Sequence, residues 1–199
     1  MKIIDRAEVL GLAEYEQVRE RFRSRVIAEK KVRRVQVGPH VTVVFENRDT
    51  VLLQIQEMLR TERITRAAAI QHEIDTYNEL VPGEAELSCT LMVAIPEKEA
   101  REAFLVAAAG LERHVWLESP GVRVRARSAP RDGAVAERTT AVHYLKFALP
   151  GVMLGALRGA GREEDTLTQV ELVIDHPACP ARAVLPVATL VALGQDLEG

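Results

Sequence analysis

Side chains that could do chemistry gather in two segments with helical periodicity, 51–64 and 67–80. Each segment carries a row of polar residues, Gln54, Glu57 and Thr61 in the first and Gln71, Asp75 and Asn78 in the second. If the rows face each other, carboxylates meet the imidazole of His72, as in helix-pair metal sites. The candidate ligands of a divalent metal are then Glu57, Glu62, His72 and Asp75. The Glu-x-x-His pairs of di-iron bundles are missing, which favours an internal ion-pair network or a partner surface.

A second concentration of functional side chains is basic. Between positions 19 and 34, eight Lys and Arg residues accompany only Glu20 and Glu29. The candidate partner-binding residues are Arg19, Arg21, Arg25, Lys30, Lys31, Arg33 and Arg34. Such a stretch steers an acidic protein or contacts phosphate. Single-strand binding also needs interleaved aromatics, and only Phe22 is present, which disfavours RNA. The structural alternative is a solvated basic helix.

The remaining candidate groups are isolated. His176 and Cys179 have zinc-ligand spacing, but no further ligand pair lies near them, so the pattern favours a turn after a strand. His114 and His143 each fall in a strand-like run, where a hydrogen-bonded structural role is the common one. The sequence contains no nucleophile elbow, zinc-protease helix, phosphate loop or dinucleotide fingerprint. Whether the protein is an enzyme is therefore open, and no cofactor is predicted beyond the candidate divalent metal.

Composition narrows the class of protein. The 199 residues are 47% hydrophobic, 28% charged and only 4% aromatic, which predicts a folded chain with an aliphatic core. The net charge of −3 gives no whole-protein argument for nucleic acid or an anionic membrane. The two cysteines are far apart, and no signal peptide or membrane-length apolar run is present. We expect a cytoplasmic protein with free thiols.

The elements that must position these residues can be placed by periodicity. Asp5 and Glu8 form a capping box before a helical stripe that reaches residue 31. Gly38 and Pro39 mark the turn of a hairpin over 32–46, and two helices follow within 47–81. The second half alternates, with strands expected at 87–95, 113–118, 122–127, 139–149, 167–175 and 183–185 and helices at 96–109, 150–158 and 187–197.

Hairpins dominate this pattern and strict strand–helix–strand alternation is absent. We therefore predict an α+β fold, with a mainly antiparallel sheet, an N-terminal helix and a helical hairpin. A single domain spanning 1–199 is expected, with a possible subdivision only near 128–137. Uncovered sheet edges are compatible with a homo-oligomer.

These stretches also resemble a known family. The segment from Arg25 to Ile64, with QIQEMLRTERI, is similar to the bacterial domain-of-unknown-function family 3501. IQHEIDTYNELVP, LSCTLMVAIP, LERHVWLE, TTAVHYLKFAL and VELVIDHPACPARAVLP continue the resemblance in order. It implies recurrent residues of unknown role at Gln54, Glu57, Arg60, Glu62, Arg63, Asp75, Tyr77 and Asn78. It also implies an aromatic residue where Cys179 stands, which weakens a thiol role.

The resemblance implies a setting and no reaction. Members of the family tend to be encoded beside rubrerythrin-like proteins and iron–sulfur oxidoreductases. The leading hypothesis is therefore an accessory protein of such a redox or oxidative-stress system, which binds its iron–sulfur or rubrerythrin-like partner through residues 19–34 and 51–80. The alternatives are a metal-dependent enzyme or metal-binding protein built on 51–80, and RNA or phosphate binding through 19–34.

Overall fold

The computed structural model describes residues 1–128, 137–160 and 169–198. The helices in this part are η1 (Arg6–Glu8), α1 (Leu12–Val32), α2 (Arg48–Thr61), α3 (Ala67–Asn78), α4 (Lys98–Ala107), η2 (Leu111–Arg113), α5 (Gly151–Gly159) and α6 (Val187–Glu198). The strands are β1 (Arg34–Val37), β2 (Val41–Glu46), β3 (Glu86–Val93), β4 (Val115–Ser119), β5 (Val122–Arg125), β6 (Arg127–Ser128), β7 (Val142–Ala148), β8 (Glu171–Ile174) and β9 (Ala181–Val184). Most of the predicted subdivision near 128–137 lies outside the described residues.

The strands form two antiparallel sheets. Their orders are β1-β2-β3-β7-β6 and β5-β4-β8-β9. β5 pairs with β4, whereas β6, one residue further along, pairs with β7. The chain thus passes from one sheet to the other at Ala126. The α+β prediction is confirmed, but the sequence pattern did not separate the two sheets, because pairing partners are not encoded in the period of a strand.

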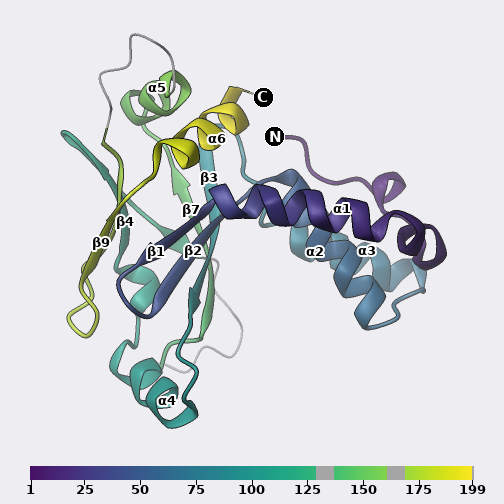
Figure 1. Cartoon of the computed structure of the whole chain (residues 1–199), viewed down its shortest axis with the longest axis horizontal. Coiled ribbons are helices and arrows are strands. Elements are labelled where there is room, and N and C mark those ends of the chain that lie inside the picture. Colours follow the sequence, from purple (N-terminus) through teal and green to yellow (C-terminus); the bar gives the residue numbers. More distant parts are fainter. Residues whose placement is uncertain (129–136, 161–168, 199) are drawn as a thin grey trace.

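The main core lies between the two sheets. Alternate residues of each strand point inward, so Val43 and Phe45 of β2, Leu91 of β3 and Leu117 of β4 are all fully buried in one cluster. Burying an aliphatic or aromatic side chain contributes about 1.5–3 kcal/mol. At its two ends the sandwich is flanked by α4 and by the α5–α6 pair (Figure 1).

Helices α1, α2 and α3 lie together to one side of the sheets (Figure 1). A second apolar cluster joins α2 and α3 through Ile55, Leu59, Ile70 and Ile74. α2 and the segment after α3 contact the face of the first sheet that points away from the second. For example, Lys146 of β7 donates to the carbonyl of Val81.

Local signals placed these elements accurately. The Asp5–Glu8 capping box is present, but it caps only the N-terminus of the short helix η1. The long helix α1 begins separately, after Gly11. Gly38 has a φ of 70° in the β1–β2 turn, a conformation that glycine adopts without strain. Asn47 caps α2 by accepting from the backbone N–H of Thr50 at 3.0 Å.

Candidate functional site: the polar seat of helix α1

Helix α1 contacts the rest of the protein mainly through polar groups. Of its 21 residues only Tyr15 and Val26 are buried. The face that points inward carries, at steps of three and four, Tyr15, Arg19, Phe22, Val26, Glu29 and Arg33. We call the residues of β2, α2 and α6, with the N-cap of α2, that pair with side chains of α1 and with Arg33 the polar seat. Its described members are Glu46, Asn47, Asp49, Glu57, Arg60 and Asp196.

Glu57 of α2 anchors the first half of α1. Nε and a terminal nitrogen of Arg19 donate to its two oxygens at 2.8 and 2.9 Å, and Tyr15 donates its hydroxyl at 2.6 Å. The hydrogen bonds from Arg19 are the main reason that the pKa of Glu57 lies below its usual value. Burial, followed by the contact with Glu57, raises the pKa of Tyr15. The fork of Arg19 fixes the carboxylate in orientation as well as in charge.

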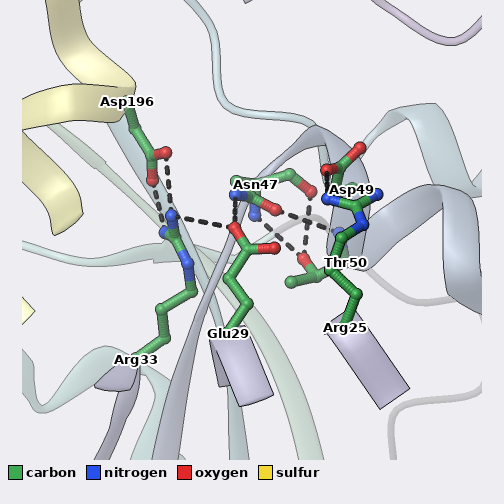
Figure 2. A network of polar contacts seen from close by, with 7 residues as sticks. All are labelled: Arg25, Glu29, Arg33, Asn47, Asp49, Thr50 and Asp196. Carbon is green, nitrogen blue, oxygen red and sulfur yellow. Dashed lines mark hydrogen bonds and ion pairs between the residues drawn. The ribbon is translucent and has the colours of Figure 1, made fainter. Parts of the chain in front are cut away.

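The second half of α1 is held by the network of Figure 2. Arg33, only 4% exposed, donates to both oxygens of Asp196 on α6 and lies 3.2 Å from Glu29. Glu29 also accepts from the amide of Asn47. Arg25 closes the network on the α2 side, 2.5 Å from Asp49. This network joins α1, α2 and α6, which are far apart in sequence.

Glu46, the last residue of β2, lies buried beneath α1. One carboxylate oxygen accepts from Thr90 at 2.6 Å and from Gln54 at 3.2 Å. Lys30 of α1 approaches the other oxygen at 3.8 Å. The neighbouring Cys89 points into the core between the sheets, and burial raises the pKa of its thiol. Such a thiol is protonated and chemically inert.

The basic stretch is thereby divided into two sets. Arg19, Arg25, Lys30 and Arg33 form ion pairs with carboxylates of the seat. The exposed residues Arg21, Arg23, Lys31 and Arg34 have no ion pair within the described residues. The sequence alone treated both sets as one surface.

The polar residues of 51–80 do not converge between α2 and α3, whose shared interface is apolar. Gln54, Glu57 and Arg60 contact β2 and α1 instead. Asn78 holds the N-terminal segment, because its side chain exchanges two hydrogen bonds with the backbone of Ile4. Asp75 accepts from Gln71 on its own helix, and Tyr77 packs on the α2–α3 cluster. Glu62 is the C-cap of α2, and Arg63 follows it with a φ of 52°.

The four candidate metal ligands are likewise dispersed. Glu57 is engaged by Arg19 and Tyr15, while Glu62 and His72 are exposed on the hairpin. Within 1–128, 137–160 and 169–198, no three His, Cys, Asp or Glu side chains are grouped to hold a metal ion.

His176 ends β8 in a hydrogen-bonded turn, as the sequence predicted. Its Nδ1 accepts from the N–H of Ala178, so the hydrogen bonds assign the proton to Nε2, which faces the carbonyl of Ala109 at 3.1 Å. Cys179 is partly buried beside this turn. His143 is buried, and its Nε2 lies 2.8 Å from the hydroxyl of Thr139.

A second polar group lies on the outer face of the second sheet. Nδ1 of His114 is 2.9 Å from Asp175, and Arg123 reaches the other oxygen of that carboxylate at 2.7 Å. Arg123 also stacks on Trp116, 4.0 Å from the ring centroid. Burial opposes the charge of Asp175, but interactions with Trp116, His114 and Arg123 hold its pKa below the ordinary value. The side chains of His114, Asp175 and Arg123 are partly exposed and pair with one another, whereas Nε1 of Trp116 is buried and has no hydrogen-bond partner among the described residues.

Sequence reasoning missed the two carboxylates that receive α1, Glu46 and Asp196. Glu46 had a detectable signal, since it is the charged end of the otherwise apolar and threonine-bearing run VTVVFE. A charge there is rare without a partner. Asp196 had none, because its partner Arg33 lies 163 positions away.

Comparison with known proteins agrees with this fold. A crystal structure titled as a novel protein of unknown function from Burkholderia pseudomallei K96243 is similar, with 33% identity and a TM-score of 0.89. The match covers 98% of this chain and 100% of the other. No curated protein matches the chain, and none of the described helices is long and apolar enough to cross a membrane. The family model described as "Protein of unknown function (DUF3501)" matches residues 3–197, so the chain belongs to that family.

Proposed function

We propose that this protein is an accessory protein that docks an acidic partner protein on the exposed surface of α1 and the start of β1. The observation that carries the proposal is the division of the basic stretch. Arg21, Arg23, Lys31 and Arg34 are exposed and have no ion pair among the described residues. We call these four the free basic set. Unpaired arginines at the surface supply charge and bidentate hydrogen bonds to carboxylates of another molecule.

The polar seat contributes by fixing the position of α1 and therefore of the free basic set. α1 is tied to α2 through Glu57 and to α6 through Asp196, at its two ends. A docking helix that is already ordered loses little conformational entropy on binding, which favours affinity. Exposed Ile27 and Val32 add apolar area next to the free cations, at 36% and 41% exposure.

The family resemblance supports a partner class. It points to an iron–sulfur or rubrerythrin-like protein in the cytoplasm, because such proteins are encoded beside family members. Electrostatic docking also suits a partner that must associate and dissociate quickly. The chain's contribution in this proposal is binding, and no reaction is assigned to it.

The test is an anaerobic pull-down from native cells, with the wild-type chain and an Arg21→Glu/Lys31→Glu variant. We expect an acidic partner to be captured by the wild type and its recovery to fall at least tenfold with the variant. The matched control is Arg66→Glu/Lys98→Glu, which makes the same charge change at exposed positions, the N-cap of α3 and the start of α4. This control should retain the partner.

Three results would contradict the proposal. One is equal recovery with both double variants at low salt, which would place the contact elsewhere. Another is the absence of a stoichiometric protein. The third is recovery of RNA instead, with affinity that falls steeply against the logarithm of salt concentration.

A further inference from the structure

Two buried polar atoms beneath α1 have no hydrogen-bond partner in the described part of the chain, and they lie on adjacent strands. They are Oε2 of Glu46 and Oγ of Ser88. The two residues are direct neighbours in the β2–β3 register and are 3% and 1% exposed. Side chains that are opposite each other in such a register lie with their Cβ atoms about 4.5–5.5 Å apart on one face.

An unpaired buried acceptor is costly, at about 1–3 kcal/mol and more for a charged group. The other oxygen of the Glu46 carboxylate, Oε1, has its hydrogen bonds, because it accepts from both Thr90 and Gln54. Lys30 is the nearest cation to Oε2, but 3.8 Å is too long for a hydrogen bond. The register places the two unpaired atoms on one face of the sheet, where a third group can reach both, and they do not bond to each other.

We propose that Glu46, Ser88 and Lys30 form a binding site for one internal water molecule. The ligand must donate to Oε2 of Glu46, since a carboxylate oxygen only accepts. It must also accept from the ammonium of Lys30, which only donates. A metal cation here would be repelled by Lys30 and an anion by Glu46. A small neutral molecule with both a donor and an acceptor meets these demands, and three polar partners are typical of a buried water.

This water site links three elements, because Lys30 belongs to α1, Glu46 to β2 and Ser88 to β3. Lys30 is 23% exposed in its side chain and forms the solvent side of the site, so exchange with bulk water passes beside it. The site is independent of the proposed docking surface, which uses the exposed surface of the same helix and the start of β1.

The first measurement is the oxygen-17 magnetic relaxation dispersion of water, which counts long-lived internal waters. We expect Ser88→Val to contain one fewer than the wild type, because its added methyl group takes the place of the water. The matched control is Thr42→Val, which removes a hydroxyl from the same face of β2. That hydroxyl is already bonded to Gln36 at 2.7 Å, so the control should keep the wild-type count.

An equal count in the wild type and a folded Ser88→Val would overturn the proposal. A high-resolution crystal structure of the wild type tests it without a variant. We expect one density peak within hydrogen-bond distance of both Glu46 Oε2 and Ser88 Oγ. Direct contact between Lys30 Nζ and Oε2, with no such peak, would show that the lysine itself fills the site.

Discussion

Two regions of this molecule are held together by different physics. The space between the sheets is filled by aliphatic side chains and Phe45 and Phe147, all fully or nearly fully buried. The contact between α1 and its neighbours is instead a row of carboxylates, guanidinium groups and one tyrosine. Apolar burial is non-directional, so it tolerates exchange of one aliphatic side chain for another. The seat of α1 depends on named partners in fixed geometry.

This difference indicates what each region does. The sheet core supplies stability, while the seat fixes the position of α1 with little apolar area. A buried ion pair contributes modestly to net stability, because the cost of removing both charges from water offsets their attraction. Removal of one partner is a different matter, since it leaves a buried charge alone. The comparison can be tested by breaking each region separately.

The largest effect is expected in the core. Leu117→Ala removes a fully buried side chain from β4 and should lower the free energy of unfolding by about 3–4 kcal/mol. The effect should be the same at low and high salt, because no charge is involved. Urea denaturation at two salt concentrations checks this. A strongly salt-dependent loss would mean that the variant also disturbs the polar seat.

Asp196→Ala should lower the free energy of unfolding by about 3 kcal/mol, nearly as much as Leu117→Ala. This loss is at the low end for a broken buried ion pair, because Glu29 still faces Arg33. The double variant Arg33→Met/Asp196→Leu should recover part of the loss, since neither charge of the Arg33–Asp196 pair is left buried alone. Glu29 loses its contact with Arg33 in this variant and keeps the hydrogen bond from Asn47. Denaturation of the two variants and the wild type measures this. If the double variant is less stable than Asp196→Ala, the pair contributes more than its desolvation cost and the comparison fails.

Gly194→Ala is a smaller test, at the contact between α6 and α5. A Cβ at this position would lie 2.3 Å from the backbone oxygen of Leu157, so the helices must move apart. We expect a loss of about 1–3 kcal/mol. The control Gly155→Ala has open space around its Cβ on α5 and should stabilise by about 0.5–1 kcal/mol. Thermal melts suffice, and similar melting temperatures for the two variants would contradict the close packing.

The smallest effect concerns pH. The folded pKa of Glu57 is lowered, chiefly by hydrogen bonds from Arg19, so the unfolded chain binds a proton more readily. Its stabilising contribution is full above the unfolded pKa, near 4.5, and is lost as pH falls through the folded value. Denaturation between pH 3 and pH 7 should therefore show a shallower acid loss for Glu57→Gln than for the wild type. An unchanged slope of stability against pH would show that the charge of Glu57 does not stabilise the polar seat.

Much of the fold followed from local signals. The Gly38-Pro39 turn, the start of the helical pair at 47 and the alternation in β4 and β5 each placed an element close to its observed bounds. The candidate site was less predictable. Glu57 and Arg19 were both selected as functional residues but were placed in different candidate groups and not paired with each other, because their pairing spans 38 positions. Helical periodicity shows which residues share a face and not what that face meets.

Local patterns were enough to predict the class, most of the elements and the family, since periodicity, caps and turns act over a few residues and the family's motifs are contiguous. The division of the strands into two sheets, and the choice of which basic residues stay available, became visible in the folded arrangement. Arg33 and Arg34 are neighbours of the same charge sign, yet one is buried against Asp196 and the other is exposed. The reason is physical, because the partner of a charge is chosen by the folded backbone, and sequence distance does not restrict that choice.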